Sequence, residues 1–284
     1  MGRIERRIPE WIRYRIPSGA NYTRIKKIIR DERLHTVCTE ARCPNIGECL
    51  CKGTATFLIL GDRCTRHCRY CAVQHGRPLG LDEEEPERVA RAIGAMGLSH
   101  AVITSVTRDD LPDGGAGIFA RTVGAVRGRL PSCRVELLIP DFMHSVEESL
   151  SRVIAARPDV IGHNIEVVRN LFNTLRPQGD YGLSLKVLQR ISGSGIPAKS
   201  GLMIGFGETP EDIRASLHDL REAGCSLLTV GQYLRSRRDG VPVEKFYTPE
   251  EFEGIASMAR ALGFSGVIAG PMVRSSYHAA EMLE

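Results

Sequence analysis

Past residue 52 the chain repeats one pattern, a short apolar run followed by a longer stretch with apolar residues at three- and four-residue steps. The short runs predict strands and the longer stretches predict helices, because an apolar helix face repeats about every 3.6 residues. Strands that alternate with helices form a parallel sheet joined by right-handed crossovers. The predicted strands are 56–60, 101–105, 135–139, 160–163, 201–205, 227–232 and 265–269, and the predicted helices are 87–96, 146–156, 183–191, 211–223 and 250–262.

The number of these repeats limits the architecture. Six strands, each followed by a crossover that in five cases contains a predicted helix, and one final strand fall short of the eight units that close a barrel. We therefore predict an α/β fold whose centre is an open, partial (βα)6 TIM-like barrel over residues 53–264. Residues 1–52 would form an N-terminal extension, and residues 265–284 would form a last strand and a C-terminal segment. In such barrels the loops that follow the strands hold the functional groups.

Three cysteines follow the first predicted strand. Cys64, Cys68 and Cys71 lie in the run C-T-R-H-C-R-Y-C. Three thiolates at this spacing can hold three irons of a [4Fe-4S] cluster and leave the fourth iron open to another ligand. A structural zinc ion needs four protein ligands, usually from paired Cys-x-x-Cys knuckles, and no second knuckle lies downstream. The spacing therefore favours a cluster over zinc.

A second set of three cysteines lies earlier in the chain. Cys38, Cys43 and Cys49 form the pattern C-x4-C-x5-C, which again offers three thiolates and predicts a second cluster. Two alternatives stay open from the spacing alone: a disulfide, or a zinc site that uses Cys51 as its fourth ligand. The other cysteines, Cys133 and Cys225, lie in or beside apolar runs and are expected to be small buried side chains.

Tyr70 stands directly before the third cysteine of the first run and completes the pattern C-x3-C-x-aromatic-C. With this residue the motif resembles that of the radical S-adenosylmethionine superfamily. The resemblance implies that S-adenosylmethionine would bind the open iron. It also implies that an electron from the cluster would cleave this cofactor to methionine and a 5′-deoxyadenosyl radical. The partial barrel predicted above is the fold of that superfamily.

Longer segments resemble the lipoyl synthase family. They are the Pro-x-Trp segment at 9–11, the second cysteine set with its continuation through C-K-G-T-A-T-F-L-I-L-G-D at 51–62, S-V-T-R-D-D-L at 105–111, and R-S-S-Y at 274–277. The resemblance implies that Cys38, Cys43 and Cys49 hold an auxiliary [4Fe-4S] cluster. It assigns Ser276 as the fourth ligand, with Ser275 as the alternative. A serine oxygen is a harder ligand than a thiolate, so that iron should be easily released.

The same resemblance implies a substrate and partners. The substrate would be an octanoyl group in amide linkage to a lysine of a lipoyl carrier domain, either the glycine cleavage H protein or the acyltransferase subunit of a 2-oxoacid dehydrogenase. The radical would remove hydrogen from C6 and then C8, and the auxiliary cluster would donate both sulfur atoms. A ferredoxin- or flavodoxin-type reductant and an iron–sulfur carrier protein that rebuilds the consumed cluster would be further partners.

Polar residues at other strand ends are candidate contacts for S-adenosylmethionine. By the resemblance, residues after the second strand contact its methionine part, those after the fourth strand contact its ribose or amino group, and glycines of G-F-G-E at 205–208 let the backbone approach the adenine. Taken singly, each has the alternative explanation of a helix cap, a turn or a surface charge. The candidates are Tyr70, Thr104, Ser105, Asn164, Glu166 and Lys199.

Two other function classes stay open. One is a different sulfur-inserting or methylthio-transferring radical enzyme, against which R-S-S-Y argues. The other is a non-enzymatic iron–sulfur carrier or electron-transfer protein, against which the open coordination positions and the barrel-length chain argue. The chain departs from the family in Q-Y-L-R-S-R-R-D-G at 232–240, where Ser236 and Asp239 stand near the expected Arg-Pro and histidine. This departure affects the docking of the carrier and touches no cluster ligand.

Composition limits the surroundings of the protein. A formal net charge of +4 from 38 basic and 34 acidic residues predicts no nucleic-acid partner and permits an acidic protein partner. Apolar runs are short and interrupted by charge, which predicts no membrane span, and the arginine-rich start lacks the apolar core of a secretory signal. Nine cysteines suit a reducing compartment, so we expect a cytoplasmic protein.

Overall fold

The computed structural model has at its centre one sheet of eight strands, in the order β1-β2-β5-β6-β7-β8-β9-β10. It describes residues 8–283, so residues 1–7 of the predicted N-terminal extension and Glu284 lie outside the description. All pairs from β2 to β10 are parallel, and β1 pairs with β2 in antiparallel fashion. The predicted parallel α/β architecture is therefore confirmed. The strands are β1 (His35–Thr36), β2 (Thr56–Ile59), β5 (His100–Ser105), β6 (Arg134–Leu138), β7 (Val160–Gly162), β8 (Ala198–Ile204), β9 (Leu227–Gln232) and β10 (Gly266–Gly270).

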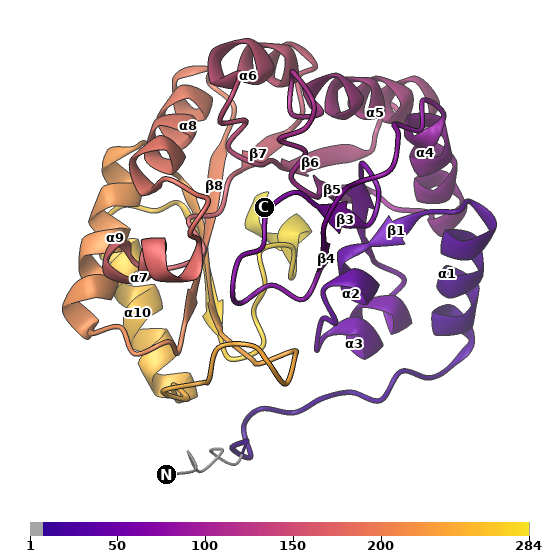
Figure 1. The fold of residues 1–284 in the computed structure, drawn as a ribbon. Coiled ribbons are helices and arrows are strands. Elements are labelled where there is room, and N and C mark those ends of the chain that lie inside the picture. The colour runs from indigo at the N-terminus through magenta and orange to yellow at the C-terminus, as the bar shows by residue number, and fades with distance from the viewer. Residues whose placement is uncertain (1–7, 284) are drawn as a thin grey trace.

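Helices connect successive strands and cover the outer side of the sheet. Figure 1 shows the strands curving around a central space with the helices outside them. Helices α9 and α10 each begin with a proline in the first turn and a reciprocal capping box, which fixes where the preceding loops end. No helix among residues 8–283 is long and apolar enough to cross a membrane. The helices are α4 (Glu85–Met96), α5 (Ala116–Arg129), α6 (Val146–Ala155), α7 (Arg169–Leu175), α8 (Tyr181–Gly193), α9 (Pro210–Glu222) and α10 (Pro249–Ala261).

Helix α5 was not predicted from the sequence. Gly117, Gly124 and Gly128 lower its intrinsic helix propensity and interrupt its apolar pattern. In the fold, Phe119 and Val123 are completely buried, and α5 packs against α4 and α6. Tertiary packing therefore stabilises a helix that local propensity does not favour.

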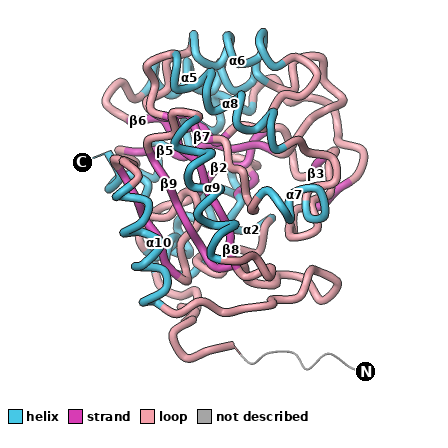
Figure 2. Tube along the Cα trace, turned by 90° about the vertical axis from the view of Figure 1, so that its left-hand side faces the viewer, coloured by secondary structure: helices cyan, strands magenta, loops and turns pink. Residues whose placement is uncertain are grey.

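The N-terminal extension packs on the first half of the barrel. It begins with an arm without regular structure over residues 8–19 and continues with α1 (Ala20–Asp31), β1, α2 (Val37–Glu40) and α3 (Ile46–Cys51). Ile25 of α1 is buried in the same apolar core as Phe57 of β2. The indole Nε1 of Trp11 donates to the carbonyl oxygen of Tyr247 at 3.1 Å. The arm therefore connects α1 with the loop before α10, along the lower edge of the molecule in Figure 2.

The chain after β10 turns back into the barrel. Figure 1 shows this segment in yellow within the central space, where it ends in the 3-10 helix η1 (Ala279–Leu283). The amide Nδ2 of Asn45 donates to the carbonyl oxygen of Met272 at 2.6 Å, so the segment contacts the N-terminal extension. A Cβ atom on Gly231 of β9 would lie only 2.1 Å from the carbonyl oxygen of Val273. Only glycine at position 231 lets the segment lie this close to β9.

We predict that Gly231→Ala displaces the C-terminal segment, because the added methyl group would overlap a backbone oxygen that no rotamer change can move. Amide hydrogen exchange at residues 272–282 should become faster, while exchange in β8 stays slow. Gly254→Ala in α10 is the control, since a Cβ there meets nothing within 4 Å. That variant should be roughly 0.5–1 kcal/mol more stable. Unchanged exchange in Gly231→Ala would contradict the packing described here.

Candidate functional site

The first cysteine set lies on the loop that follows β2 and includes the short strands β3 (Arg63–Cys64) and β4 (Gln74–His75). The chain turns at Leu60, whose φ of 69° lies in the left-handed region. Its amide donates to Oε2 of Glu85 at 2.8 Å, and its carbonyl oxygen accepts from Nη1 of Arg108 at 3.1 Å. These two contacts support a strained turn and fix the direction in which the loop leaves the sheet.

Arg66 lies between Cys64 and Cys68 and connects this loop to the ends of β5 and β6 through ion pairs. Its guanidinium donates to the carboxylate of Asp141 at 2.6 and 2.7 Å and to that of Asp109 at 2.7 and 2.8 Å. Burial alone would raise the pKa of Asp141, but the hydrogen bonds and charge of Arg66 hold it below its usual range. The loop is therefore held in one arrangement by buried, fully paired charges.

The thiols of this loop face a restricted environment. Cys71 lines an inner cavity of about 390 Å³, and Cys64 and Cys68 are partly buried on the same loop. Burial raises the pKa of Cys71 to about 12 and also raises that of Cys68. The backbone amide of Thr107 donates to Sγ of Cys64 at 3.3 Å. Without a metal the thiols of Cys68 and Cys71 stay protonated, and iron would have to displace their protons.

The second cysteine set borders a second cavity of about 510 Å³. Cys38 comes from α2, Cys49 from α3 and Cys43 from the turn between them, and Ser275 and Ser276 enter from the C-terminal segment. Burial raises the pKa of Cys38 to about 11 and that of Cys49 to about 12. The predicted ligands therefore share one cavity, although more than 200 residues separate Ser276 from the cysteines.

Cys51 does not join this set. Its Sγ donates to the carbonyl oxygen of Ser18 at 3.0 Å, and it does not line the second cavity. The zinc alternative therefore loses its fourth ligand, and all nine cysteines are free, so the disulfide alternative has no support. Among residues 8–283, no three His, Cys, Asp or Glu side chains converge on one ion position. Thiolates that bind separate irons of a cluster stand further apart than ligands of one ion, so this arrangement is compatible with clusters in both sets.

The two cavities have part of their walls in common. Thr104, Leu138, Arg274 and Ser275 are among the residues that line both, so Cys71 and the second cysteine set border adjoining parts of one interior. Part of this interior is apolar, since Leu138 lines both cavities and Leu58 lines the inner one. The arrangement can hold an apolar chain between two metal groups.

Of the predicted S-adenosylmethionine contacts, five line the inner cavity: Tyr70, Thr104, Ser105, Asn164 and Glu166. The hydroxyl of Thr104 donates to the carbonyl oxygen of Leu138 at 2.8 Å, and Nδ2 of Asn164 donates to Glu166 at 3.0 Å. Oγ of Ser105 and Oδ1 of Asn164 are buried without a partner in the described part of the chain. Buried polar atoms are nearly always paired, so these two atoms indicate a polar ligand.

Glu166 has a strained backbone at this cavity. Its φ of 67° is left-handed, and its amide and carbonyl oxygen bond to Gly201 and Met203 of β8 at 3.0 and 2.7 Å. Burial raises the pKa of its carboxyl, against the charge of Arg176. Strain of this kind persists where a site requires it. Met203 also lines this cavity.

The predicted position of Lys199 was wrong. Strand β8 begins at Ala198 and not at residue 201, so Lys199 lies inside the strand. Its Nζ forms an ion pair with Glu136 at 2.7 Å, the residue is only 2% exposed, and it does not line the inner cavity. Residues 199 and 200 are polar, so the sequence pattern did not indicate that the strand begins before residue 201. The ion pair with the Glu136 carboxylate allows Lys199 to be buried inside the strand.

The G-F-G-E loop at 205–208 is stabilised by hydrogen bonds to its own glutamate. Gly205 and Phe206 both donate their backbone amides to the carboxylate of Glu208, at 2.6 and 2.9 Å. These amides are therefore occupied within the protein. Phe206 stacks on Tyr233 with ring centroids 4.1 Å apart and lies 6.2 Å from Tyr70, which lines the inner cavity together with Tyr233.

Sequence reasoning missed Arg274. Its side chain lines both cavities, and its one hydrogen bond among the described residues goes to the carbonyl oxygen of the adjacent Val273. Burial lowers the pKa of Arg274, and the nearby Cys43 and Glu166 oppose this shift. The R-S-S-Y motif contained this residue, but only its serines were assigned a role. A cation without a carboxylate partner between two thiol sets offers charge compensation for anionic clusters.

Family models match most of this chain. Residues 58–220 match the radical SAM superfamily, and residues 2–43 match the N-terminal domain of lipoyl synthase. Lipoyl synthase of Rubrobacter xylanophilus is 52% identical over 97% of this chain and 86% of its own length. This chain belongs to the lipoyl synthase family. The lipoyl synthases of Nitrosococcus oceani and Mycobacterium ulcerans are each 50% identical, over 96% and 99% of this chain and 85% and 86% of their own lengths.

Solved structures show the same fold at low identity to this lipoyl synthase family member. A maturase of the [FeFe]-hydrogenase aligns with a TM-score of 0.59 and 18% identity, over 73% of this chain and 50% of that one. Methylornithine synthase aligns with a TM-score of 0.53 and 16% identity, over 66% of this chain and 56% of that one. The chain thus spans about half the length of these proteins, and the likeness concerns the fold alone.

We predict that Arg66→Met destabilises the protein by about 3–5 kcal/mol, because it leaves the fully buried carboxylate of Asp141 without its partner. Urea unfolding of the metal-free protein measures this change. Arg190→Met is the matched control, since the Arg190 and Glu147 side chains are both exposed and their ion pair contributes little. Equal unfolding midpoints for the two variants would show that the Arg66 network does not hold the loop.

Proposed function

We propose that this protein inserts two sulfur atoms, at C6 and C8, into a protein-bound octanoyl-lysine and so forms the lipoyl cofactor. The observation that carries the proposal is that Cys71 of the first cysteine set lines the inner cavity, which has walls in common with the cavity that Cys38, Cys43 and Cys49 border. An unactivated C–H bond cannot be broken by a side-chain acid or base at neutral pH, so a radical is needed. Sulfur must then lie close to the carbon radical, which a common interior allows.

Cys64, Cys68 and Cys71 would hold a [4Fe-4S] cluster, which supplies the open iron for S-adenosylmethionine and the electron that releases a 5′-deoxyadenosyl radical. The protein's own groups would bind and orient the cofactor. Ser105 Oγ and Asn164 Oδ1 have free hydrogen-bonding capacity among the described residues, and the Glu166 carboxylate faces the same cavity. We leave Lys199 out of this set because of its position in β8.

Cys38, Cys43, Cys49 and Ser276 would hold the auxiliary cluster that supplies sulfur. The hydroxyl of Thr56 donates to Oγ of Ser276 at 2.7 Å. A donor at this distance stabilises negative charge on a serine oxygen and so favours it as a ligand. Thr56 would thereby make Ser276, rather than its neighbour, the fourth ligand.

Further partners follow from this function. Octanoylated lipoyl carrier domains, namely the glycine cleavage H protein and 2-oxoacid dehydrogenase acyltransferase subunits, would present the substrate. A ferredoxin- or flavodoxin-type protein would supply electrons. An iron–sulfur carrier protein would rebuild the auxiliary cluster after its sulfur is consumed.

The function is tested by anaerobic incubation of the reconstituted protein with S-adenosylmethionine, dithionite and an octanoyl-lysine peptide, followed by mass spectrometry. We expect two added sulfur atoms on the peptide together with 5′-deoxyadenosine. Cys68→Ala should abolish both products, whereas Cys43→Ala should retain deoxyadenosine and lose sulfur insertion, because the two cysteine sets have separate roles. Formation of deoxyadenosine without sulfur on the peptide would indicate a different substrate. If neither product forms, the result would favour an iron–sulfur carrier.

The fourth auxiliary ligand is tested by paired serine variants. In a background with Cys64→Ala, Cys68→Ala and Cys71→Ala, which leaves only the auxiliary cluster, Ser276→Ala should leave that cluster with three protein ligands. It should then lose one iron and show the electron paramagnetic resonance signal of a three-iron cluster after oxidation. Ser275→Ala should keep the four-iron spectrum. The reverse pattern would assign Ser275 as the ligand, and equal spectra in both variants would exclude serine ligation.

A further inference from the structure

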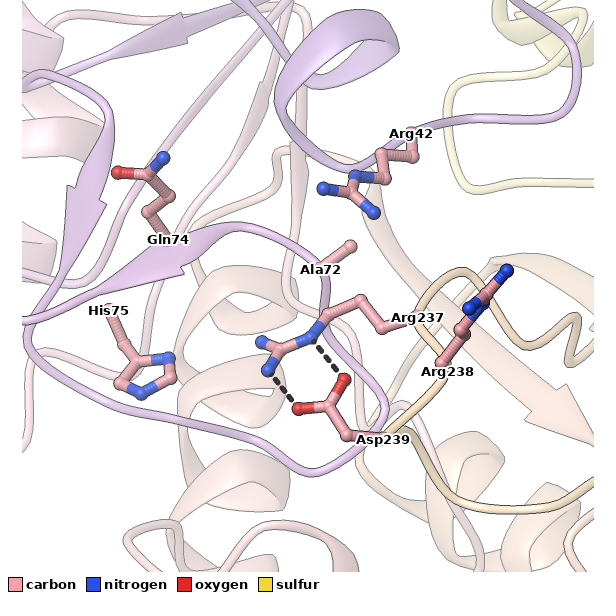
Figure 3. A pocket seen from close by; sticks show the side chains of 7 residues that line it. All are labelled: Arg42, Ala72, Gln74, His75, Arg237, Arg238 and Asp239. Carbon is pink, nitrogen blue, oxygen red and sulfur yellow. Dashed lines mark hydrogen bonds and ion pairs between the residues drawn. The ribbon is translucent and has the colours of Figure 1, made fainter.

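An open hollow lies beside the inner cavity, between the segment that follows Cys71 and the loop that follows β9. It has a volume of about 570 Å³ and is termed here the basic rim. Figure 3 shows its side chains, with Ala72 between those of Arg42 and Arg237. Arg42 and Ala72 also line the inner cavity, so the rim adjoins the entrance. The basic rim consists of Arg42, Ala72, Gln74, His75, Arg237, Arg238 and Asp239.

The basic rim carries positive charge that the protein does not compensate. Arg237 forms an ion pair with Asp239, and its hydrogen bonds lower the pKa of that carboxyl. The side chains of Arg42 and Arg238 are exposed, and neither has a hydrogen-bond or ion-pair partner among residues 8–283. Two arginines without carboxylates beside one entrance attract an anionic partner.

The loop after β9 that presents Arg237 and Arg238 is fixed by its own hydrogen bonds. The hydroxyl of Tyr233 donates to the carbonyl oxygen of Val241 at 2.8 Å. The amide of Gly240 and Nε of Arg235 both donate to the carbonyl oxygen of Arg237, at 3.0 and 3.1 Å. A partner that binds here orders little additional structure, so less free energy is lost on binding.

The N-terminal arm carries two exposed aromatic side chains, one of which lines the inner cavity together with Arg42. Tyr14 is 48% exposed and lines the inner cavity together with Arg42. Trp11 is 40% exposed and is held to the loop before α10 through Tyr247. Arginine with tyrosine and tryptophan is the composition enriched at protein interfaces, whereas a small anion would need donors converging on one point.

We propose that the basic rim docks an acidic face of the folded carrier domain that bears the octanoyl-lysine substrate. This inference rests on the proposed function. The carbons that react lie at the far end of the lysine and octanoyl chain, so only that chain has to enter the inner cavity. The folded carrier stays outside, where carboxylates on its surface meet Arg42 and Arg238.

The docking is tested by comparing two substrates in the reconstituted holoenzyme, the octanoylated glycine cleavage H protein and a short octanoyl-lysine peptide. Arg238→Glu should lower kcat/KM for the carrier about five- to tenfold, mainly through KM, and weaken its dependence on salt. Turnover of the peptide should not change, because the peptide has no folded face to dock. Arg238→Lys should restore most of the carrier activity, and Arg214→Glu on the exposed side of α9 should affect neither substrate.

Three results would overturn the docking proposal. Carrier and peptide turnover that fall equally in Arg238→Glu would indicate a damaged site, and carrier turnover that does not fall would exclude the rim. A defect that appears only with a flavodoxin as reductant and disappears with dithionite would assign the rim to the electron donor. Failure of the proposed function is distinct from these results, since the unaltered protein would then add sulfur to neither substrate.

Discussion

The ion pairs of Arg66 with two carboxylates connect three strand ends, and the arrangement of the first cysteine set depends on them. Arg66 follows β2, Asp109 follows β5 and Asp141 follows β6. Buried charges are tolerated only when their hydrogen bonds are complete, so none of the three loops can move without breaking the others' contacts. The neighbouring Cys64 and Cys68 are thereby positioned before metal binds, and the ordering that a cluster must impose is reduced.

Cations also compensate the charge that the thiolates would bring. A four-iron cluster with three thiolates is anionic, and a low-dielectric interior makes such charge costly. Arg274 lies on the common wall of both cavities. Arg176 is buried beside the first set, where Cys68 and Glu166 are among the groups that raise its pKa. The interior therefore suits two anionic groups facing an uncharged acyl chain.

The sequence predicted the sheet well, because alternating apolar runs and helical stretches are local patterns. It failed where tertiary contacts decide the structure. The glycines of α5 weaken its helical pattern, so this packed helix was not predicted. Lys199 can be buried inside β8 because it forms an ion pair with Glu136. Among the site residues, cysteine spacing located both thiol sets. The role of Arg274 and the separation of Cys51 from its neighbours depend on contacts distant in sequence, which no local pattern contains.

The C-terminal segment within the barrel has a consequence for the order of assembly. The first cysteine set and its supporting carboxylates span residues 64–141, so their contacts close short loops. The second cavity needs Ser276 beside Thr56, 220 positions apart, and Met272 beside Asn45, 227 positions apart. Closing loops of that length is slow and requires the intervening strands. During folding, the second cavity would therefore be completed last, after the loop that carries the first cysteine set has formed its contacts with Asp109 and Asp141.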